Sequence, residues 1–128
     1  MAQLDHINMS VKNLNESIQW YNKVFQFQLV EQGRSSGIPY AILKSGESML
    51  CIYEQPGLKN PDDSKGFHRT YHFGLRITDR ESWENTVKEE KVDVDHEWKY
   101  PHSYSWYVND PSGHEIEVVL WDKNQIQF

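Results

Sequence analysis

Hydrophobic and polar residues alternate along two stretches of the chain that resemble each other. In residues 6–11 (HINMSV) and again in residues 72–77 (HFGLRI), every second residue is apolar. A period of two residues is typical of a strand with one apolar and one polar face. Each stretch begins with a histidine, His6 or His72, at an offset of 72 − 6 = 66. Both histidines are therefore expected on the polar face of their strand.

A helix and three further strands are predicted after each of these stretches. Asn13 or Asn15 in the first unit and Asp79 in the second are residue types that cap helix N-termini. The apolar residues that follow them are spaced for one face of a helix. Shorter strands are then expected at about 27–31, 40–43 and 48–53, and at about 94–99, 104–108 and 114–121. Each unit is predicted to have the order β-α-β-β-β.

An internal repeat of this kind predicts one α+β domain, spanning residues 1–128, that is built from two modules. Module one covers about residues 1–60 and module two about residues 70–122. The segment between them, residues 54–66, is rich in Pro, Gly and charge, which predicts a connecting loop. We expect two curved mixed sheets around a shared cleft, with the helices outside. The loops at 34–39 and 54–69 are expected to shape the pocket.

The composition narrows the class of partner. A chain of 128 residues with five Trp, seven Tyr and five Phe can bury one core. A net charge of −6 with scattered Lys and Arg argues against nucleic-acid binding. Neither a signal sequence nor an apolar run near the ~20 residues of a membrane span is seen. The single cysteine, Cys51, leaves no internal disulfide. A cytoplasmic protein with a small-molecule partner is expected, without nucleic acid or membrane.

Three residues form a candidate metal site: His6, His72 and Glu117. Glu117 lies in residues 110–118 (DPSGHEIEV), which begin as a turn and end as a strand. Taken singly, each of the three is typical of an ordinary surface or core position. Together they comprise two imidazoles at equivalent places in a repeat and one carboxylate. This set predicts the facial triad that holds a divalent metal ion and leaves coordination positions open for water and substrate. The other histidines show no such pattern and are expected in loops or on the surface: His68, His96, His102 and His114.

The repeat leaves a fourth metal ligand open. The position in module one that corresponds to Glu117 is 117 − 66 = 51, which is Cys51, whereas aligning the glycines of the preceding turns gives Leu50. Cys51 can bind a soft metal as a thiolate, but a lone buried cysteine usually behaves as a small hydrophobic residue. Glu54 is a further candidate, although its strand parity is opposite.

Three segments of the chain resemble the vicinal oxygen chelate superfamily: LDHINMSVKNLNESIQWYNKVFQF, YHFGLRI and WYVNDPSGHEIEV. This superfamily includes glyoxalase I, extradiol ring-cleaving dioxygenases, fosfomycin thiol transferases and bleomycin-resistance proteins. The resemblance covers nearly the whole chain. It implies a divalent metal ion (Fe, Zn, Ni or Mn) held by His6, His72 and Glu117. It also implies a homodimer, in which a site can combine modules of two subunits.

The resemblance leaves the reaction open. It favours a glyoxalase-like lyase or isomerase, because MLCIYEQPG lacks the second-sphere histidine of the extradiol dioxygenases. An extradiol dioxygenase is the alternative, since Tyr107 stands ten residues before Glu117, as in those enzymes. Fosfomycin-modifying relatives use several basic residues, of which Arg76 could be one. Tyr107, Glu54 and Arg76 are the candidate catalytic residues, for proton transfer or anchoring.

A non-catalytic binding protein is the alternative from another class. Some members of the superfamily lack a metal and hold an aromatic ligand in an aromatic cleft. Aromatic residues of the second module could line such a cleft or belong to the core: Trp98, Tyr100, Tyr104, Trp106 and Tyr107.

Overall fold

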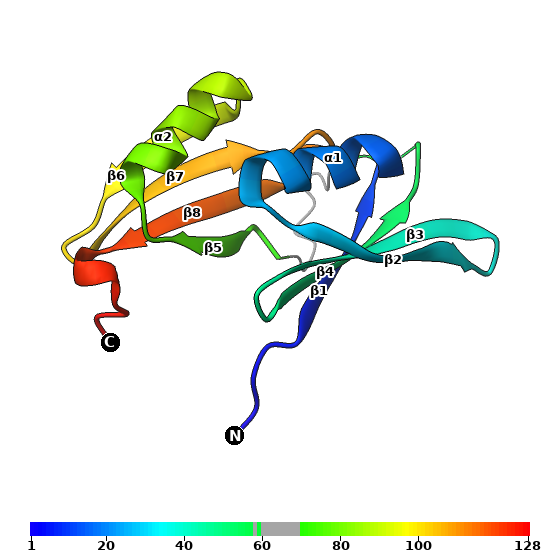
Figure 1. Cartoon of the computed structure of the whole chain (residues 1–128), viewed down its shortest axis with the longest axis horizontal. Helices are drawn as coiled ribbons and strands as arrows, with labels where there is room; N and C mark the ends of the chain where they lie inside the picture. Colours follow the sequence, from blue (N-terminus) through cyan, green and yellow to red (C-terminus); the bar gives the residue numbers. More distant parts are fainter. Residues whose placement is uncertain (58, 60–69) are drawn as a thin grey trace. The chain divides into compact units, whose positions relative to one another are not determined.

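The computed structural model describes residues 1–57, 59 and 70–128. It divides into two compact units, Met1–Lys59 and Asn60–Phe128, each with a four-stranded mixed sheet and an α-helix (Figure 1). The expected α+β architecture with two β-α-β-β-β modules is confirmed. The shared cleft stays a prediction. No helix in the described part of the chain is long and apolar enough to cross a membrane.

Unit one contains a sheet with the strand order β1-β4-β3-β2. Its elements are β1 (His6–Val11), α1 (Leu14–Phe25), β2 (Gln28–Ser35), β3 (Ile38–Ser45) and β4 (Ser48–Glu54). Strands β1 and β4 pair in parallel, and the other pairs are antiparallel. Helix α1 contacts β2, β3 and β4, and its apolar face and the sheet beneath it form the buried core. The polar face of β1, which carries His6, is left exposed.

Unit two repeats this arrangement with the strand order β5-β8-β7-β6. Its elements are β5 (Phe73–Ile77), α2 (Arg80–Glu89), β6 (Asp93–Lys99), β7 (Ser103–Asn109), β8 (Glu115–Trp121) and a 3-10 helix (Asp122–Asn124). Strands β5 and β8 are parallel. Trp83 of α2 contacts Trp106 of β7 with ring centroids 6.3 Å apart. The helix therefore covers one face of the sheet. Glu117 points to the opposite face, because it alternates along β8 with the buried Ile116 and Val118.

The strand register shows how the two modules correspond. In unit one Asn8 pairs with Cys51, and in unit two Gly74 pairs with Glu117. Because Asn8 and Gly74 each follow a candidate histidine by two residues, Cys51 occupies the position equivalent to Glu117. The alternative alignment with Leu50 is wrong, because Leu50 points to the opposite face, where it is only 2% exposed.

The segment 34–39, which we expected to be a pocket-shaping loop, is the tip of a β-hairpin. Strand β2 continues to Ser35 and β3 begins at Ile38. The two residues between them, Ser36 and Gly37, have φ of 50° and 80°. Positive φ at both central residues is typical of the two-residue hairpin turn that matches the twist of the strands. Most of the other expected loop, 54–69, lies outside the described residues.

Side-chain caps fix the start of both helices. Asn13 Oδ1 accepts a hydrogen bond from the backbone N–H of Glu16 (2.9 Å), and Asp79 Oδ1 accepts one from Ser82 N–H (3.0 Å). Glu54, at the end of β4, accepts a further bond from Leu14 N–H (2.9 Å). Of the two candidates in the first module, Asn13 is thus the cap. The carboxylate of Glu54 helps to anchor the helix to the sheet.

Removing the Asn13 cap should destabilise the protein. Asn13→Ala leaves the Glu16 N–H without its side-chain acceptor, and we expect the free energy of unfolding to fall by about 1 kcal/mol. Asn15→Ala is the matched control, because Asn15 is exposed inside the helix and should change stability by less than about 0.5 kcal/mol. Urea unfolding at neutral pH measures both, and an equal loss in the two variants would contradict the capping assignment.

Candidate functional site

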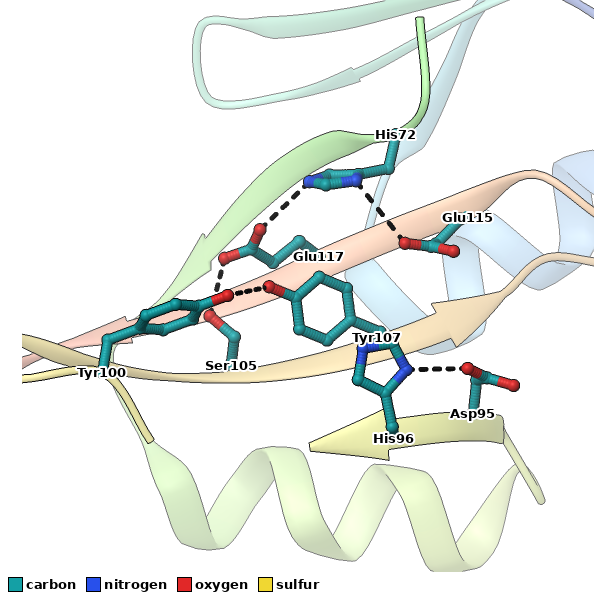
Figure 2. Close-up of polar contacts among 8 residues, drawn as sticks. All are labelled: His72, Asp95, His96, Tyr100, Ser105, Tyr107, Glu115 and Glu117. Carbon is teal, nitrogen blue, oxygen red and sulfur yellow. Dashed lines mark hydrogen bonds and ion pairs between the residues drawn. The ribbon is translucent and has the colours of Figure 1, made fainter. Parts of the chain in front are cut away.

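A row of paired residues crosses all four strands of unit two on the face opposite α2. Gly74 of β5 pairs with Glu117 of β8, Glu117 with Tyr107 of β7, and Tyr107 with His96 of β6. Directly paired residues point to the same side of a sheet. Glu117, Tyr107 and His96 therefore project together, and His72 joins them from just before β5 (Figure 2).

The side chain of Glu117 is held by contacts at both carboxylate oxygens. His72 Nε2 lies 3.0 Å from Glu117 Oε1. The Ser105 hydroxyl donates a 2.7 Å hydrogen bond to Glu117 Oε2, and Ser105 is fully buried. The Glu117 side chain is 20% exposed and that of His72 34%. The carboxylate is thus fixed in orientation while Oε1 remains at the open side of the sheet.

A second carboxylate contacts the other nitrogen of His72. Glu115 Oε1 lies 3.5 Å from His72 Nδ1, so the imidazole stands between two residues of β8. Histidines that bind metal ions through Nε2 commonly offer Nδ1–H to a carboxylate, which fixes the tautomer. Glu115 stands in the position of such a partner.

His6 of unit one has the same kind of partner. Its Nδ1 lies 2.7 Å from Asp5 Oδ2. Since a carboxylate only accepts hydrogen bonds, this contact places a proton on Nδ1, so in the neutral imidazole the lone pair is on Nε2. Both candidate histidine ligands therefore have a carboxylate at Nδ1.

The separation of His72 Nε2 and Glu117 Oε1 is that of a hydrogen bond, and two ligand atoms of one divalent ion have a similar separation. Bonds of about 2.1 Å meeting at a right angle place two ligand atoms roughly 3 Å apart, and Nε2 and Oε1 are 3.0 Å apart. Within the described residues, no three side chains of His, Cys, Asp or Glu are grouped closely enough to hold an ion. The arrangement thus supplies a two-residue half-site, which a third ligand has to complete.

Tyr107 lies between the imidazoles of His72 and His96. Its ring is edge-on to His72 (centroids 5.7 Å apart) and stacked on His96 (4.2 Å, interplanar angle 8°). Its hydroxyl lies 2.6 Å from that of Tyr100. Burial raises the pKa of Tyr107 well above its usual value, and the hydrogen bond with Tyr100 and the charge of Glu117 raise it further. Tyr107 is therefore a hydroxyl donor rather than a base at neutral pH.

Unit one has a hollow of about 370 Å³ on the polar face of its sheet. Residues from all four strands line it: His6, Asn8, Glu31, Arg34, Ser35, Tyr40, Ile42, Cys51 and Tyr53. The rings of Tyr40 and Tyr53 stack with centroids 5.7 Å apart. Burial, followed by the charges of Asp5 and Glu31, raises the pKa of the Cys51 thiol. This position, the equivalent of Glu117, therefore favours a protonated thiol.

The remaining candidates have separate environments. Arg76 is exposed on the same face as Glu117 and makes no ion pair with the residues that the structure describes. Glu54 is engaged at the start of α1, so its catalytic role stays a prediction. Tyr104 and Trp106 lie under Arg80 of α2 (4.5 and 5.2 Å to the ring centroids) and so belong to the helix-covered face. His68 lies outside the described residues.

Three residues of this face were not predicted as site residues: Ser105, Glu115 and His96, the last of which was expected in a loop or on the surface and lies exposed in strand β6. His96 Nδ1 lies 2.7 Å from Asp95 Oδ2, so an Asp-His pair recurs at 5–6 and 95–96. That repeated dipeptide was a signal that could have found His96. Ser105 is identifiable only once the pairing of β7 with β8 is known, and Glu115 only once the pairing of β5 with β8 is known.

These features define a class of protein: paired β-α-β-β-β modules that present histidine and carboxylate side chains on the polar faces of their sheets. The model of the Glyoxalase/Bleomycin resistance protein/Dioxygenase superfamily matches residues 3–118. The chain belongs to this superfamily, which is the vicinal oxygen chelate group that its motifs resemble.

Two kinds of relative illustrate this membership. The metallothiol transferase FosB of Staphylococcus epidermidis is 26% identical over 120 residues, which are 92% of this chain and 81% of FosB. A glyoxylase/bleomycin resistance protein/dioxygenase domain from Frankia sp. EAN1pec has a similar structure, with a TM-score of 0.81, 14% identity, and coverage of 98% of this chain and 96% of that one.

The fosfomycin resistance protein FosX of Listeria monocytogenes also has a similar fold. A variant of FosX, solved in complex with Mn(II) and 1S,2S-dihydroxypropylphosphonic acid, has a TM-score of 0.76 and 20% identity, and the match covers 95% of this chain and 94% of FosX. At this identity the likeness concerns the fold.

The raised pKa of Tyr107 predicts a pH dependence of stability. Because the folded protein holds this phenolic proton more tightly than the unfolded chain does, its contribution is fully present below pH ~10 and is lost as the pH rises toward the folded pKa. The free energy of unfolding of the wild type should therefore fall more steeply between pH 9.5 and 11 than that of Tyr107→Phe. Urea titrations over this range measure the two slopes, and parallel slopes would contradict the assignment.

Proposed function

We propose that this chain is a divalent-metal-dependent enzyme that acts on a small oxygenated substrate. The observation that carries the proposal is the His72–Glu117 contact, in which two donor atoms lie 3.0 Å apart on an open face, with Ser105 fixing the carboxylate. His6 is the proposed third ligand, from the same chain or from the partner in a homodimer. When bound, the ion would polarise a substrate oxygen as a Lewis acid. The two modules, residues 1–60 and 70–122, are proposed to form one functional domain. The protein is proposed to be cytoplasmic.

The reaction that we propose first is the addition of a thiol or of water to a small epoxide such as fosfomycin. The relationship to FosB, a metallothiol transferase, supports thiol addition. The ligand in the FosX complex is a vicinal diol that also carries a phosphonate, and a vicinal diol is what water addition to an epoxide yields. Arg76 is exposed on the same face as Glu117 and has no ion-pair partner among the described residues. Its guanidinium is the proposed anchor for an anionic group.

A glyoxalase-like lyase or isomerase is the second candidate. The network around Glu117 supports it, because a fixed carboxylate beside an imidazole and a tyrosine can move a proton on a bound substrate. Tyr107 remains the feature that favours an extradiol dioxygenase. Oxygen uptake separates the dioxygenase from the other reactions, since ring cleavage consumes dioxygen.

Metal content tests the proposal directly. Protein purified without added metal or chelator should contain about one divalent ion per chain, and Glu117→Gln and His72→Ala should each lose it. Glu47→Gln is the matched control, because Glu47 is an exposed turn residue, and it should keep the ion. Elemental analysis and a titration with Mn²⁺ measure both content and affinity. If the wild type binds no ion even after soaking with several divalent metals, the chain is a non-catalytic binding protein.

Activity is tested with fosfomycin and a small thiol, or fosfomycin alone, in the presence of the metal found. We expect consumption of the epoxide by the wild type, loss of activity on chelation and recovery when the metal is restored. Arg76→Gln should raise KM more than it lowers kcat, because it removes an anchor for the anion. Turnover of methylglyoxal adducts in place of fosfomycin would favour the glyoxalase-like lyase or isomerase. Turnover of catechols would favour the dioxygenase.

A homodimer is part of the same proposal. Sedimentation at micromolar concentration should give a mass about twice that of the 15.2 kDa chain. A His6→Ala chain and a His72→Ala chain, each inactive alone, should regain activity on mixing if one site draws on both subunits. If sedimentation shows a 15.2 kDa species alone and this species has full metal content, the dimer prediction is wrong and the enzyme proposal is unaffected.

A further inference from the structure

His96 projects from an irregular part of β6. The register between β6 and β7 shifts between Val94 and His96, so Asp95 is an extra residue in that strand. A β-bulge of this kind re-aims the side chains beside it and is frequent next to active sites. Here it brings the side chains of two successive residues, Asp95 and His96, into hydrogen-bond contact on the open side of the sheet (Figure 2).

Two contacts fix the orientation of the His96 imidazole. Asp95 Oδ2 lies 2.7 Å from Nδ1, which places the proton on Nδ1, because a carboxylate can only accept. The ring lies flat on that of Tyr107, with the centroids 4.2 Å apart. The second nitrogen, Nε2, has no hydrogen-bond partner among the described residues. The side chain is half exposed, so this lone pair is accessible to a bound molecule.

The other acid-base groups of this face are already engaged. Glu115 and Glu117 both contact His72. Tyr107 shares its hydroxyl hydrogen bond with Tyr100. His96 therefore presents a basic atom that remains available for a reacting group. Asp95 is placed to stabilise the imidazolium that forms when Nε2 takes up a proton.

The spacing between His96 and Glu117 suits a reaction between two molecules. The two residues are separated by one strand, so their Cβ atoms stand about 10 Å apart, twice the spacing of neighbouring strands. That span accommodates a substrate oxygen beside Glu117, a reacting carbon, and a nucleophile whose proton lies within hydrogen-bond reach of Nε2. The Tyr107 side chain, with its ring stacked on His96, stands between the two ends of this span.

We propose that His96, oriented by Asp95, is the proton-transfer residue of this site, acting on the thiol or water that adds to the substrate. This inference rests on the proposed function. Nε2 takes the proton from the thiol S–H or water O–H as the new C–S or C–O bond forms. The C–O bond of the epoxide breaks, and its electron pair remains on the released oxygen. The released oxygen takes up a proton from solvent and the imidazolium gives its proton to solvent, so the net reaction is addition of the nucleophile across the ring and His96 ends neutral.

The test compares variants at 95 and 96 in the metal-loaded full chain. With fosfomycin and a small thiol, His96→Gln should lower kcat by about 10²- to 10⁴-fold, the usual contribution of a general acid-base group. Its metal content should equal that of the wild type, because His96 is not a proposed ligand. Asp95→Asn should lower kcat less. Asp93→Asn, whose carboxylate accepts a hydrogen bond from Asn109 (3.2 Å), is the matched control and should keep wild-type kcat.

Chemical rescue separates proton transfer from a structural role. Adding imidazole to His96→Ala should restore part of the lost rate, in proportion to the unprotonated imidazole present, and should not affect His72→Ala. Three results would each overturn the role of His96 and leave the proposed function standing. They are a wild-type kcat in His96→Gln, loss of the bound metal from His96→Gln, and a loss of activity in His96→Ala that imidazole does not relieve. A wild type that opens no epoxide with any metal would overturn the proposed function, and the role of His96 with it.

Discussion

The His72–Glu117 contact depends on the parallel pairing of β5 with β8, in a register that places Gly74 beside Glu117. His72 precedes Gly74 by two residues, so it points to the same face and reaches the carboxylate of the neighbouring strand. The antiparallel pairing of β7 with β8 brings Ser105 to the second oxygen of that carboxylate. The contacts of Glu117 with His72 and Ser105 are therefore consequences of strand register, because a shift of one residue would turn these side chains toward the core.

Burial on one side of each sheet is what makes the other side available for chemistry. In unit two, Ile116, Val118 and Trp106 are buried on the face that α2 covers, and the residues between them emerge on the opposite face. Two acidic residues of one strand, Glu115 and Glu117, would repel each other there, and the imidazole of His72 lies between them. The imidazole of His72, a candidate metal ligand, therefore contacts both carboxylates of this strand.

The two modules share a backbone arrangement but differ in side-chain chemistry. Cys51 occupies the position in unit one that Glu117 occupies in unit two, as the equivalent pairings with Asn8 and Gly74 show. Unit one combines a thiol with two stacked tyrosines in its hollow, whereas unit two presents carboxylates and imidazoles. A duplicated fold can keep its core pattern while its polar faces change, because exposed positions contribute little to packing.

The fold class and the presence of two modules could be predicted from the alternation of apolar residues, the cap residues and the 66-residue offset, because these features are local or repeat along the chain. They also indicated His6, His72 and Glu117 as a set. Which residues join Glu117 and Tyr107 on this face depended on the tertiary structure. Ser105 and Glu115 lie near Glu117 and His96 lies beside Tyr107 through strand pairing and a bulge that are set by long-range contacts. The capping contact of Glu54 with α1 was likewise hidden, since a strand end and a helix start forty residues apart meet only in the folded chain.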